Sequence, residues 1–324
     1  MTADGLPAGL GTSPAAGLAT SPAAGLPARP ATSSAAGPAT SSAAGPAAGL
    51  ALTEAVLTEA LDGVPGSLRE PCRRIAGGGN RLRAGLVLAV AGRAWPGTSR
   101  RTATAAAAVE LLHLATLVHD DLRDEAPVRD GVPTINAGEG PATALLAGDM
   151  LIGLANRLAA TAGTGPLLGD ALTAVCAGQA LEADHRFHTE VSAGTALRVA
   201  ELRTGTMLAT AGLLGAVVTG APAGRLREYG LAFGTAVHLL GNVENLPQDF
   251  AASRITLPVV HAFAAHPEPR PDHLCAGVPA TLRTVDDLVE QAAAAQPELA
   301  ELPRRYRDSQ LALLLPRYPS ALSS

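Results

Sequence analysis

The feature that most constrains the fold is a helical spacing of apolar residues, which begins near residue 50. In segment 102–123, for example, Val109, Leu112, Thr116 and Leu117 fall on one stripe at spacings of three and four. Strand-like alternation is scarce. The same spacing predicts further helices over 141–161, 166–184, 191–219, 226–245 and 257–265. The fold is therefore predicted to be all-α, a bundle of roughly ten or more helices.

Residues 1–49 differ in composition from the rest of the chain. They are almost wholly Ala, Gly, Pro, Ser, Thr and Leu, and the unit Ser-(Pro/Ser)-Ala-Ala-Gly recurs at Ser13, Ser21, Ser33 and Ser41. Such a segment buries too little apolar surface to offset the entropy lost on ordering. We predict a disordered tail over 1–49 and one folded domain over 50–324.

Composition excludes several function classes. The net charge is −5 with scattered basic residues, so the protein lacks the basic patch of a nucleic-acid-binding protein. Cys72, Cys176 and Cys275 lie far apart and match neither a disulfide framework nor a zinc site, which favours a reducing cytoplasm. No uncharged apolar run of membrane-spanning length occurs. We expect a soluble cytoplasmic protein with no stable membrane insertion.

A cluster of acids ends the apolar segment 102–123. Asp120 and Asp124 are one helical turn apart, so their carboxylates project from the same face. Asp121 and Glu125 add two more acids. Like charges this close repel one another unless a cation lies between them, and magnesium prefers carboxylate oxygens and water as ligands. The cluster predicts a magnesium site, whereas the alternative is an acidic helix end in solvent.

Neighbouring residues favour the magnesium site. The turn from Arg129 through Gly131 to Pro133 would end the helix and bring a cation back toward the acids. Before the acids, Glu110 and His113 interrupt the apolar run at spacings that point into the bundle interior.

Several motifs follow one another over residues 75–265. They are Gly78-Gly79-Asn80-Arg81-Leu82-Arg83, Glu110-Leu111-Leu112-His113, Val118-His119-Asp120-Asp121-Leu122-Arg123-Asp124, Arg129-Asp130-Gly131-Val132-Pro133-Thr134, Ala147-Gly148-Asp149-Met150-Leu151, Gly178-Gln179-Ala180-Leu181-Glu182, Arg203-Thr204-Gly205 and Arg254-Ile255-Thr256-Leu257-Pro258. In this order they resemble the trans-polyprenyl diphosphate synthases, which join isopentenyl diphosphate to an allylic prenyl diphosphate. The resemblance implies an isoprenoid-synthase helical bundle with a central cavity, and a homodimer.

The resemblance also implies roles for individual residues. Asp120 and Asp124 would bind Mg²⁺ with Asp121 in support, and these three would be the catalytic acids. The positions that grip the allylic diphosphate read Arg129, Arg203, Thr204 and Arg254. Arg203 and Arg254 stand where the family usually has Lys, which keeps the charge but alters the donor geometry.

The sequence departs from the family at the site for isopentenyl diphosphate. The positions that normally supply a Lys, an Arg, a His and a further Arg read Asn80, Arg83, His113 and Asp130. Because a carboxylate repels a diphosphate, isopentenyl diphosphate should bind poorly. Arg83 and His113 remain the candidate ligands of this site.

The second aspartate-rich motif of the family is also altered. Its three aspartates align with Gly241, Asn242 and Asn245, and Asp249 is a surviving acid beyond them. Neutral amides are weaker magnesium ligands than carboxylates, which weakens the expected third metal site. His238 replaces the usual Gln and is a candidate substrate-binding residue.

Three functions remain open. We predict first that the protein transfers prenyl groups, with Ala115 and Thr116 leaving room for a long product. The second is a terpene synthase or lyase that ionises a prenyl diphosphate without isopentenyl diphosphate. Cyclases line their cavities with aromatic rings, however, and candidates here are few, namely Trp95, Phe187 and Phe233. The third is a non-catalytic subunit that forms a heterodimer with an active synthase.

Overall fold

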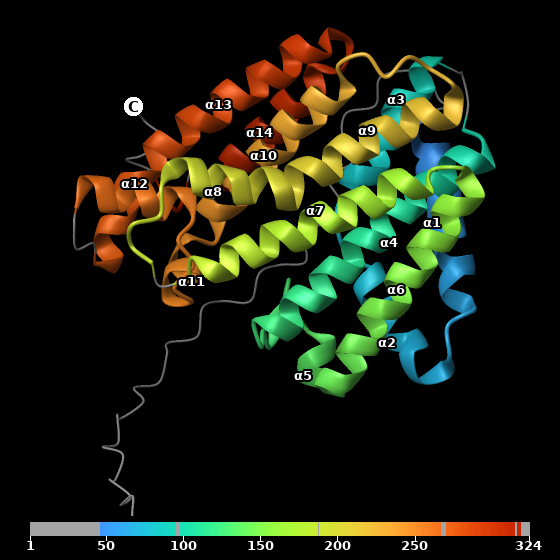
Figure 1. Ribbon diagram of the computed structural model, residues 1–324, viewed down its shortest axis with the longest axis horizontal. Helices are drawn as coiled ribbons and strands as arrows, with labels where there is room; N and C mark the ends of the chain where they lie inside the picture. Colours follow the sequence, from blue (N-terminus) through green and yellow to red (C-terminus); the bar gives the residue numbers. More distant parts are fainter. Residues whose placement is uncertain (1–45, 95–97, 187, 267–269, 315, 319–324) are drawn as a thin grey trace, which may run out of the picture. The chain divides into compact units, whose positions relative to one another are not determined.

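Helices make up nearly all of the regular structure in the computed structural model, which describes residues 46–94, 98–186, 188–266, 270–314 and 316–318. All of these belong to one unit, residues 36–324. The helices are α1 (Pro46–Asp62), α2 (Gly66–Ala76), α3 (Leu82–Ala94), α4 (Arg100–Arg123), α5 (Ile135–Glu139), α6 (Pro141–Ala162), α7 (Gly165–Asp184), α8 (Ala193–Ala200), α9 (Thr206–Thr219), α10 (Leu226–Glu244), α11 (Leu246–Ala251), α12 (Leu257–Ala265), α13 (Val278–Ala295) and α14 (Glu301–Leu314) (Figure 1).

The predicted helices match the observed ones closely. Each of the six segments named from the sequence begins and ends within two residues of observed helix ends, although segment 191–219 comprises α8, residues 201–205 and α9. The all-α fold class is confirmed. Two predictions need comment. Helix α1 begins at Pro46, so its first turn uses residues assigned to the tail. The predicted disorder of residues 1–45 lies outside the described residues.

Helix α4 is buried on almost every side. Ser99 caps its first turn by accepting a hydrogen bond from the Thr102 backbone N–H at 3.1 Å. From Thr102 to Ala115 every side chain except His113 is buried, and five of these residues are alanines at 103 and 105–108. Small side chains let neighbouring helices approach closely, and α6, α3, α1 and α9 all contact α4. The acidic end of α4 is therefore fixed by the core.

Helix α10 joins two apolar clusters. Tyr229 and Phe233 in its first half belong to a cluster that also contains residues of α1, α3, α4, α6, α7 and α9, and Leu239 and Val243 in its second half belong to a cluster with residues of α12 and α13. Phe233 is fully buried and meets the rings of Tyr229 and Tyr306 edge to face. Phe233 is therefore a core residue. The other two aromatic candidates, at positions 95 and 187, lie outside the described residues.

A long rod crosses the bundle from α8 to α9. It is continuous from Ala193 to Thr219, but its middle, Glu201–Gly205, is wound as a π-helix (Figure 1). The sequence predicted the rod as one regular helix and did not predict this change of winding. Such a bulge inserts an extra residue and redirects nearby side chains, and it is often found at functional sites.

Two helical stretches are long and apolar enough to cross a membrane by length and composition, namely α4 and the rod 193–219. Within the structure, 78% and 61% of their apolar windows are buried against other helices. Burial of this kind is typical of core helices in a bundle.

Candidate functional site

The acids at the end of α4 are largely buried. Asp120 and Asp121 are buried side chains, and Asp124 follows directly after the last helical residue, Arg123. Buried carboxylates are strongly destabilising unless cations or hydrogen-bond donors surround them. The groups that surround each acid therefore indicate which ligands this end of the bundle can bind.

Asp120 is held from two other elements. Its Oδ2 accepts a hydrogen bond from Arg203 Nη2 at 2.6 Å, and its Oδ1 accepts one from Gln179 Nε2 of α7 at 2.7 Å. Burial raises the pKa of Asp120, while the charges of Arg203 and then Arg123 oppose that rise.

Asp124 is surrounded by guanidinium groups. Arg186 Nη2 donates to its Oδ1 at 2.7 Å, Arg254 Nη2 donates to its Oδ2, and Arg123 Nε donates to its Oδ1 at 3.2 Å. Burial favours the protonated acid, but the hydrogen bond from Arg123 and the charge of Arg254 prevail and lower the pKa of Asp124. Asp124 is therefore ionised at neutral pH.

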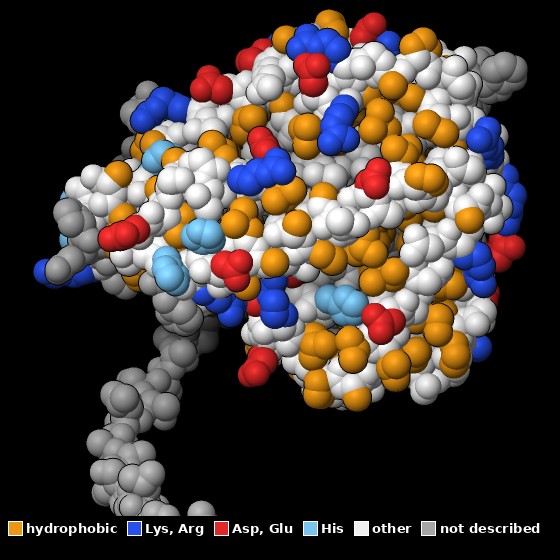
Figure 2. Space-filling view, in the orientation of Figure 1, with side chains coloured by type: hydrophobic (Ala, Val, Ile, Leu, Met, Phe, Trp, Pro, Cys, Tyr) orange, Lys and Arg blue, Asp and Glu red, His pale blue; other side chains and the backbone are white. Residues whose placement is uncertain are grey.

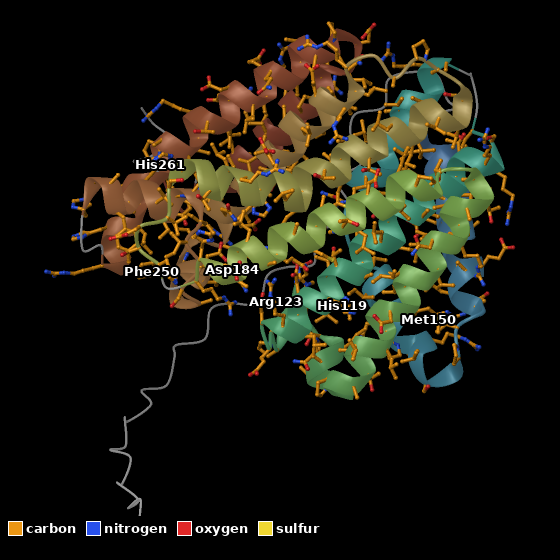
Figure 3. All side chains as sticks on the ribbon, viewed as in Figure 1. His119, Arg123, Met150, Asp184, Phe250 and His261 are labelled. Atoms are coloured by element: carbon orange, nitrogen blue, oxygen red, sulfur yellow. The ribbon has the colours of Figure 1, made fainter. Side chains whose placement is uncertain are left out.

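One nitrogen of Arg123 lies where three carboxylates converge. Arg123 Nη2 is 3.4 Å from Asp120 Oδ1, 3.3 Å from Asp124 Oδ2 and 3.3 Å from Glu182 Oε2. Figure 3 shows Arg123 at the end of α4, close to the end of α7 marked by Asp184. Two helices thus point acidic side chains at a single cation.

The π segment directs Arg203 and Thr204 into this cluster. Arg203 Nη1 donates to Glu182 Oε2 at 2.7 Å in addition to its contact with Asp120. Two glycines make room for the bulge, since a Cβ on Gly178 of α7 would lie 2.8 Å from Arg203 Cγ and one on Gly234 of α10 would lie 2.5 Å from the Thr204 carbonyl oxygen. The π segment therefore packs closely against α7 and α10 at these two glycines.

Thr204 and His238 form a neutral pair beside the cluster. Thr204 Oγ1 and His238 Nδ1 are 2.9 Å apart. Burial, followed by the charge of Arg203, lowers the pKa of His238 to about 4. His238 is uncharged at neutral pH, so it can exchange hydrogen bonds with Thr204 but adds no positive charge.

Arg254 links the acids of α4 to the altered second motif. Its Nη1 donates to Asp249 Oδ1 at 3.0 Å while its Nη2 binds Asp124. Burial raises the pKa of Asp249 to about 6 despite the nearby charge of Arg254. Asn245 Nδ2 instead donates to the Gly241 carbonyl at 3.1 Å, which uses that amide locally at the end of α10.

Eight side chains thus form two layers. We call Asp120, Asp124, Glu182 and Asp249 the carboxylate layer, and Arg123, Arg186, Arg203 and Arg254 the arginine layer. The carboxylates are 7–12% exposed and the arginines 19–31% exposed. Side chains of both signs gather on the face shown in Figure 2 where α7 ends. An anion that approaches from solvent therefore meets guanidinium groups first.

Asp121 belongs to a different part of the site. Arg129 donates to both of its oxygens, with Arg129 Nη2 2.7 Å from Asp121 Oδ1. Arg129 is held in place by strands β1 (Val128–Arg129) and β2 (Val132–Pro133), joined by the turn Asp130-Gly131 with positive φ at both residues. The predicted return of a cation toward the acids is observed, although Arg129 pairs with Asp121 and not with Asp120 or Asp124.

A cavity of about 140 Å³ adjoins Asp121 and Arg129. All four positions aligned with the isopentenyl diphosphate site line it, namely Asn80, Arg83, His113 and Asp130. The sequence motifs that carry them are remote from one another in the chain, and the fold brings them to one place.

The walls of this cavity are polar, and several of their groups have hydrogen-bond partners close by. Glu110 is buried and its Oε1 accepts a hydrogen bond from the Ala84 backbone N–H at 2.8 Å, at the start of α3. Asn80 Oδ1 accepts from the Leu82 backbone N–H at 3.1 Å. Burial and the charge of Arg83 hold the pKa of His113 well below its usual range, so this imidazole is neutral.

His119 and Asp149 have simple structural surroundings. His119 packs against Gly148, where a Cβ would come within 2.1 Å of its ring, and its Nε2 is 3.7 Å from Asp149 Oδ1. Asp149 is exposed, so it is not a buried link between helices. Gln179 does link two helices, through its hydrogen bond to Asp120.

No role was predicted for Glu182, Arg186 or Arg123 from the sequence. Gln179, Glu182 and Arg186 are spaced by three and four residues, which places them on one face of α7 and its C-terminal extension. That spacing was visible in the sequence. The spacing did not indicate that this face is turned toward Asp120 and Asp124.

The donor set suits a magnesium ion by type. Asp120, Asp124 and Glu182 offer carboxylate oxygens, the ligands that magnesium prefers, and Arg123 Nη2 marks the point that their oxygens share. As the side chains stand, no group of three Asp, Glu, His or Cys residues within the described ranges is gathered closely enough to hold a metal ion. The carboxylates are neutralised by arginines instead.

Comparison with known proteins identifies the relatives of this chain. Residues 65–290 match the polyprenyl synthetase family. The chain is 32% identical to geranylgeranyl diphosphate synthase of Methanosarcina mazei over 208 residues, 57% of this chain and 64% of that protein. It is 35% identical to nonaprenyl diphosphate synthase of Mycobacterium tuberculosis over 150 residues, 45% of each chain. The matched segments thus span less than two thirds of these relatives.

A solved structure has the same fold. The polyprenyl synthase of Caulobacter crescentus, determined in complex with calcium and isoprenyl diphosphate, superposes with a TM-score of 0.74 at 25% identity. The superposition covers 82% of this chain and 94% of that one.

Proposed function

The chain belongs to the polyprenyl synthetase family, and from that premise we propose that it ionises an allylic prenyl diphosphate in a magnesium-dependent prenyl transfer of isoprenoid biosynthesis. The observation that carries the proposal is the arginine layer, whose four guanidinium groups lie outside Asp120 and Asp124. A diphosphate needs this concentration of donors, and the carboxylate layer beneath supplies oxygens suited to its counter-ions.

The arginines have two tasks in this proposal. Guanidinium groups bind phosphate oxygens with paired N–H donors, so Arg203 and Arg254 would fix the diphosphate at the end of α4. When the bond between the allylic carbon and the diphosphate oxygen breaks, both electrons leave with the pyrophosphate. Donors already in place then stabilise the charge that accumulates there. Magnesium held by Asp120, Asp124 and Glu182 would neutralise further charge on the leaving group.

The neutral pair Thr204 and His238 would complete the grip. The Thr204 hydroxyl can donate to a phosphate oxygen, with His238 Nδ1 nearby to exchange hydrogen bonds. Because His238 is uncharged at neutral pH, it orients this donor without competing for the diphosphate.

We propose that isopentenyl diphosphate binds weakly in the 140 Å³ cavity. Of the arginines that line it, Arg74 is paired with Glu139, Arg81 with Glu54 and Arg129 with Asp121. Arg83 is the remaining one, and its Nε is buried without a hydrogen-bond partner among the described residues. The lining also contains the carboxylate of Asp130, which would repel a trianionic diphosphate.

Weak binding of isopentenyl diphosphate favours a second candidate function, that of a lyase. Such an enzyme ionises its substrate and releases a terpene without isopentenyl diphosphate. Ionisation would use the arginine layer and the carboxylate layer, and neither of them depends on this cavity. A non-catalytic subunit that pairs with an active synthase is the third alternative, and the experiment below distinguishes all three.

We further propose that the protein acts as a cytoplasmic homodimer. Leu145 and Leu146 on α6 are large apolar side chains that remain exposed on the unit, 49% and 57% respectively. Neighbouring exposed leucines of this kind are suited to burial against another protein surface.

The deciding experiment incubates the purified full chain with magnesium and farnesyl or geranylgeranyl diphosphate, with and without isopentenyl diphosphate. Longer diphosphates indicate elongation, and hydrocarbon or alcohol formed with the allylic substrate alone indicates a lyase. If no product forms until a partner synthase is added, the protein is a non-catalytic subunit.

The double variant Asp120→Asn, Asp124→Asn tests the site itself. It should lose all turnover while it stays folded. The matched control is Asp62→Asn, which removes an acid from an exposed pair with Arg73. Normal turnover by the double variant would show that the reaction takes place elsewhere.

A further inference from the structure

Arg123 differs from the rest of the arginine layer in where it comes from. It is the last residue of α4, three positions after Asp120 and directly before Asp124, whereas Arg186, Arg203 and Arg254 come from other parts of the chain. Its guanidinium therefore lies beside the acids because of its position in the chain alone. The other three need the tertiary fold to reach them.

The contacts of Arg123 are longer than those of its neighbours. Arg203 and Arg186 each approach one carboxylate oxygen of the acids on α4 at 2.6–2.7 Å. Arg123 makes contacts of 3.2–3.4 Å that are shared among Asp120, Asp124 and Glu182. A donor shared in this way is held by the summed charge of its surroundings and not by one well-formed hydrogen bond.

Arg123 also has a path to solvent. Its side chain is 31% exposed, the highest exposure in the arginine layer. The guanidinium can turn outward without disturbing the apolar core, because Arg123 is the last residue of α4 and its side chain is partly exposed.

The charges of the two layers balance before any ligand arrives. Four carboxylates face four guanidinium groups, so a divalent cation would meet no net negative charge. It would also meet Arg123 Nη2 at the point where three carboxylates converge. Two cations cannot share that point in a partly buried site.

We propose that Arg123 is a built-in counter-cation that occupies the place of a divalent metal ion between Asp120, Asp124 and Glu182 until a diphosphate binds. The diphosphate draws the guanidinium outward to its own oxygens, and the three carboxylates then accept the metal. Metal and diphosphate binding are thereby coupled, each raising the affinity for the other. This inference rests on the proposed function for the diphosphate step, but not for the competition between Arg123 and metal.

Binding of Mn²⁺ to the full chain, measured by equilibrium dialysis with excess metal, tests the proposal. The wild-type protein should bind Mn²⁺ weakly alone and at least about tenfold more tightly when inorganic pyrophosphate is present. Arg123→Gln removes the cation and should bind Mn²⁺ alone about tenfold more tightly than the wild type. Arg123→Lys keeps a positive charge and should bind like the wild type.

The control variant is Arg198→Gln on α8, which breaks an exposed pair with Glu201, the first residue of the π segment, and should leave metal affinity unchanged. Equal or weaker metal binding by Arg123→Gln overturns the proposal. If that variant does not fold, tight Mn²⁺ binding by the wild-type protein without pyrophosphate overturns it as well. Absence of any pyrophosphate binding would count against the proposed function and leave the comparison of metal affinities intact.

Discussion

The guanidinium of Arg203 donates to Asp120 at 2.6 Å although 83 residues separate the two in the chain. The contact joins the π segment of the rod 193–219 to the end of α4, and its second hydrogen bond extends it to Glu182 on α7. Three helices therefore depend on one side chain at the candidate site.

Loss of Arg203 should destabilise the fold. Arg203→Gln leaves Asp120 buried beside fewer positive charges, and breaking a buried pair from one side costs about 3 kcal/mol. Urea denaturation measures the loss. Arg198→Gln is the matched control, because its pair with Glu201 is exposed and should contribute less than about 1 kcal/mol. Equal stability of the two variants would mean that the Arg203 contacts are not formed in solution.

The π segment should be sensitive to the size of residue 234. A Cβ on Gly234 would lie 2.5 Å from the Thr204 carbonyl oxygen, which is rigid backbone. Gly234→Ala should therefore cost about 2 kcal/mol or more of stability. Gly241→Ala lies on the same helix with no atom within 4 Å of its Cβ and should be neutral or slightly stabilising. Thermal unfolding of both variants checks the difference, and a neutral Gly234→Ala would contradict the observed packing.

Asp249 should give stability a distinct pH dependence. Its pKa is raised from 3.8 to about 6, so the folded state binds its proton more tightly than the unfolded state does. Arg254, Glu182 and Arg203 are the charges that act on it. The stability it contributes is present below pH 4 and is lost as the pH rises toward 6.

Asp249→Asn removes this titration. Relative to the wild type, the variant should gain stability between pH 4 and 6, by up to about 3 kcal/mol, and the difference should be constant above that range. Urea denaturation at pH 4, 5, 6 and 7 measures it, with Asp62→Asn as the control for loss of a surface carboxylate. If the stability difference between the variant and the wild type decreased as the pH rises, the pKa of Asp249 would be lowered by folding and not raised.

Restoring positive charge should strengthen binding of isopentenyl diphosphate. In the double variant Asn80→Lys, Asp130→Arg, one acid becomes a cation and one amide becomes a cation, so affinity should rise by at least about tenfold. Asn80 also binds the Leu82 backbone N–H at the start of α3, so the variant should lose about 1 kcal/mol of stability. Calorimetric titration measures the affinity for isopentenyl diphosphate. The single variant Asp130→Asn removes the repelling carboxylate without adding a cation, so it separates the two effects. Unchanged affinity in the double variant would rule out charge as the cause.

Much of the fold follows from local patterns. The spacing of apolar residues predicted six helices within two residues of their observed ends, because burial of one helical face sets that spacing. The pairing of Asp120 with Asp124 on one face follows in the same way. The π winding of Glu201–Gly205 was not predictable, since it depends on space left by Gly178 and Gly234 on two other helices.

By itself, the sequence determined the helical class, the acidic end of α4 and the order of motifs that marks the family, because helix periodicity and residue chemistry are local properties. Only the tertiary structure decided which cation meets which acid. In that structure Arg129 pairs with Asp121, Arg254 bonds to both Asp124 and Asp249, and Glu182 contacts Arg123. These pairings depend on how helices pack, and packing is set by the shapes of whole faces and not by the spacing of residues within one segment.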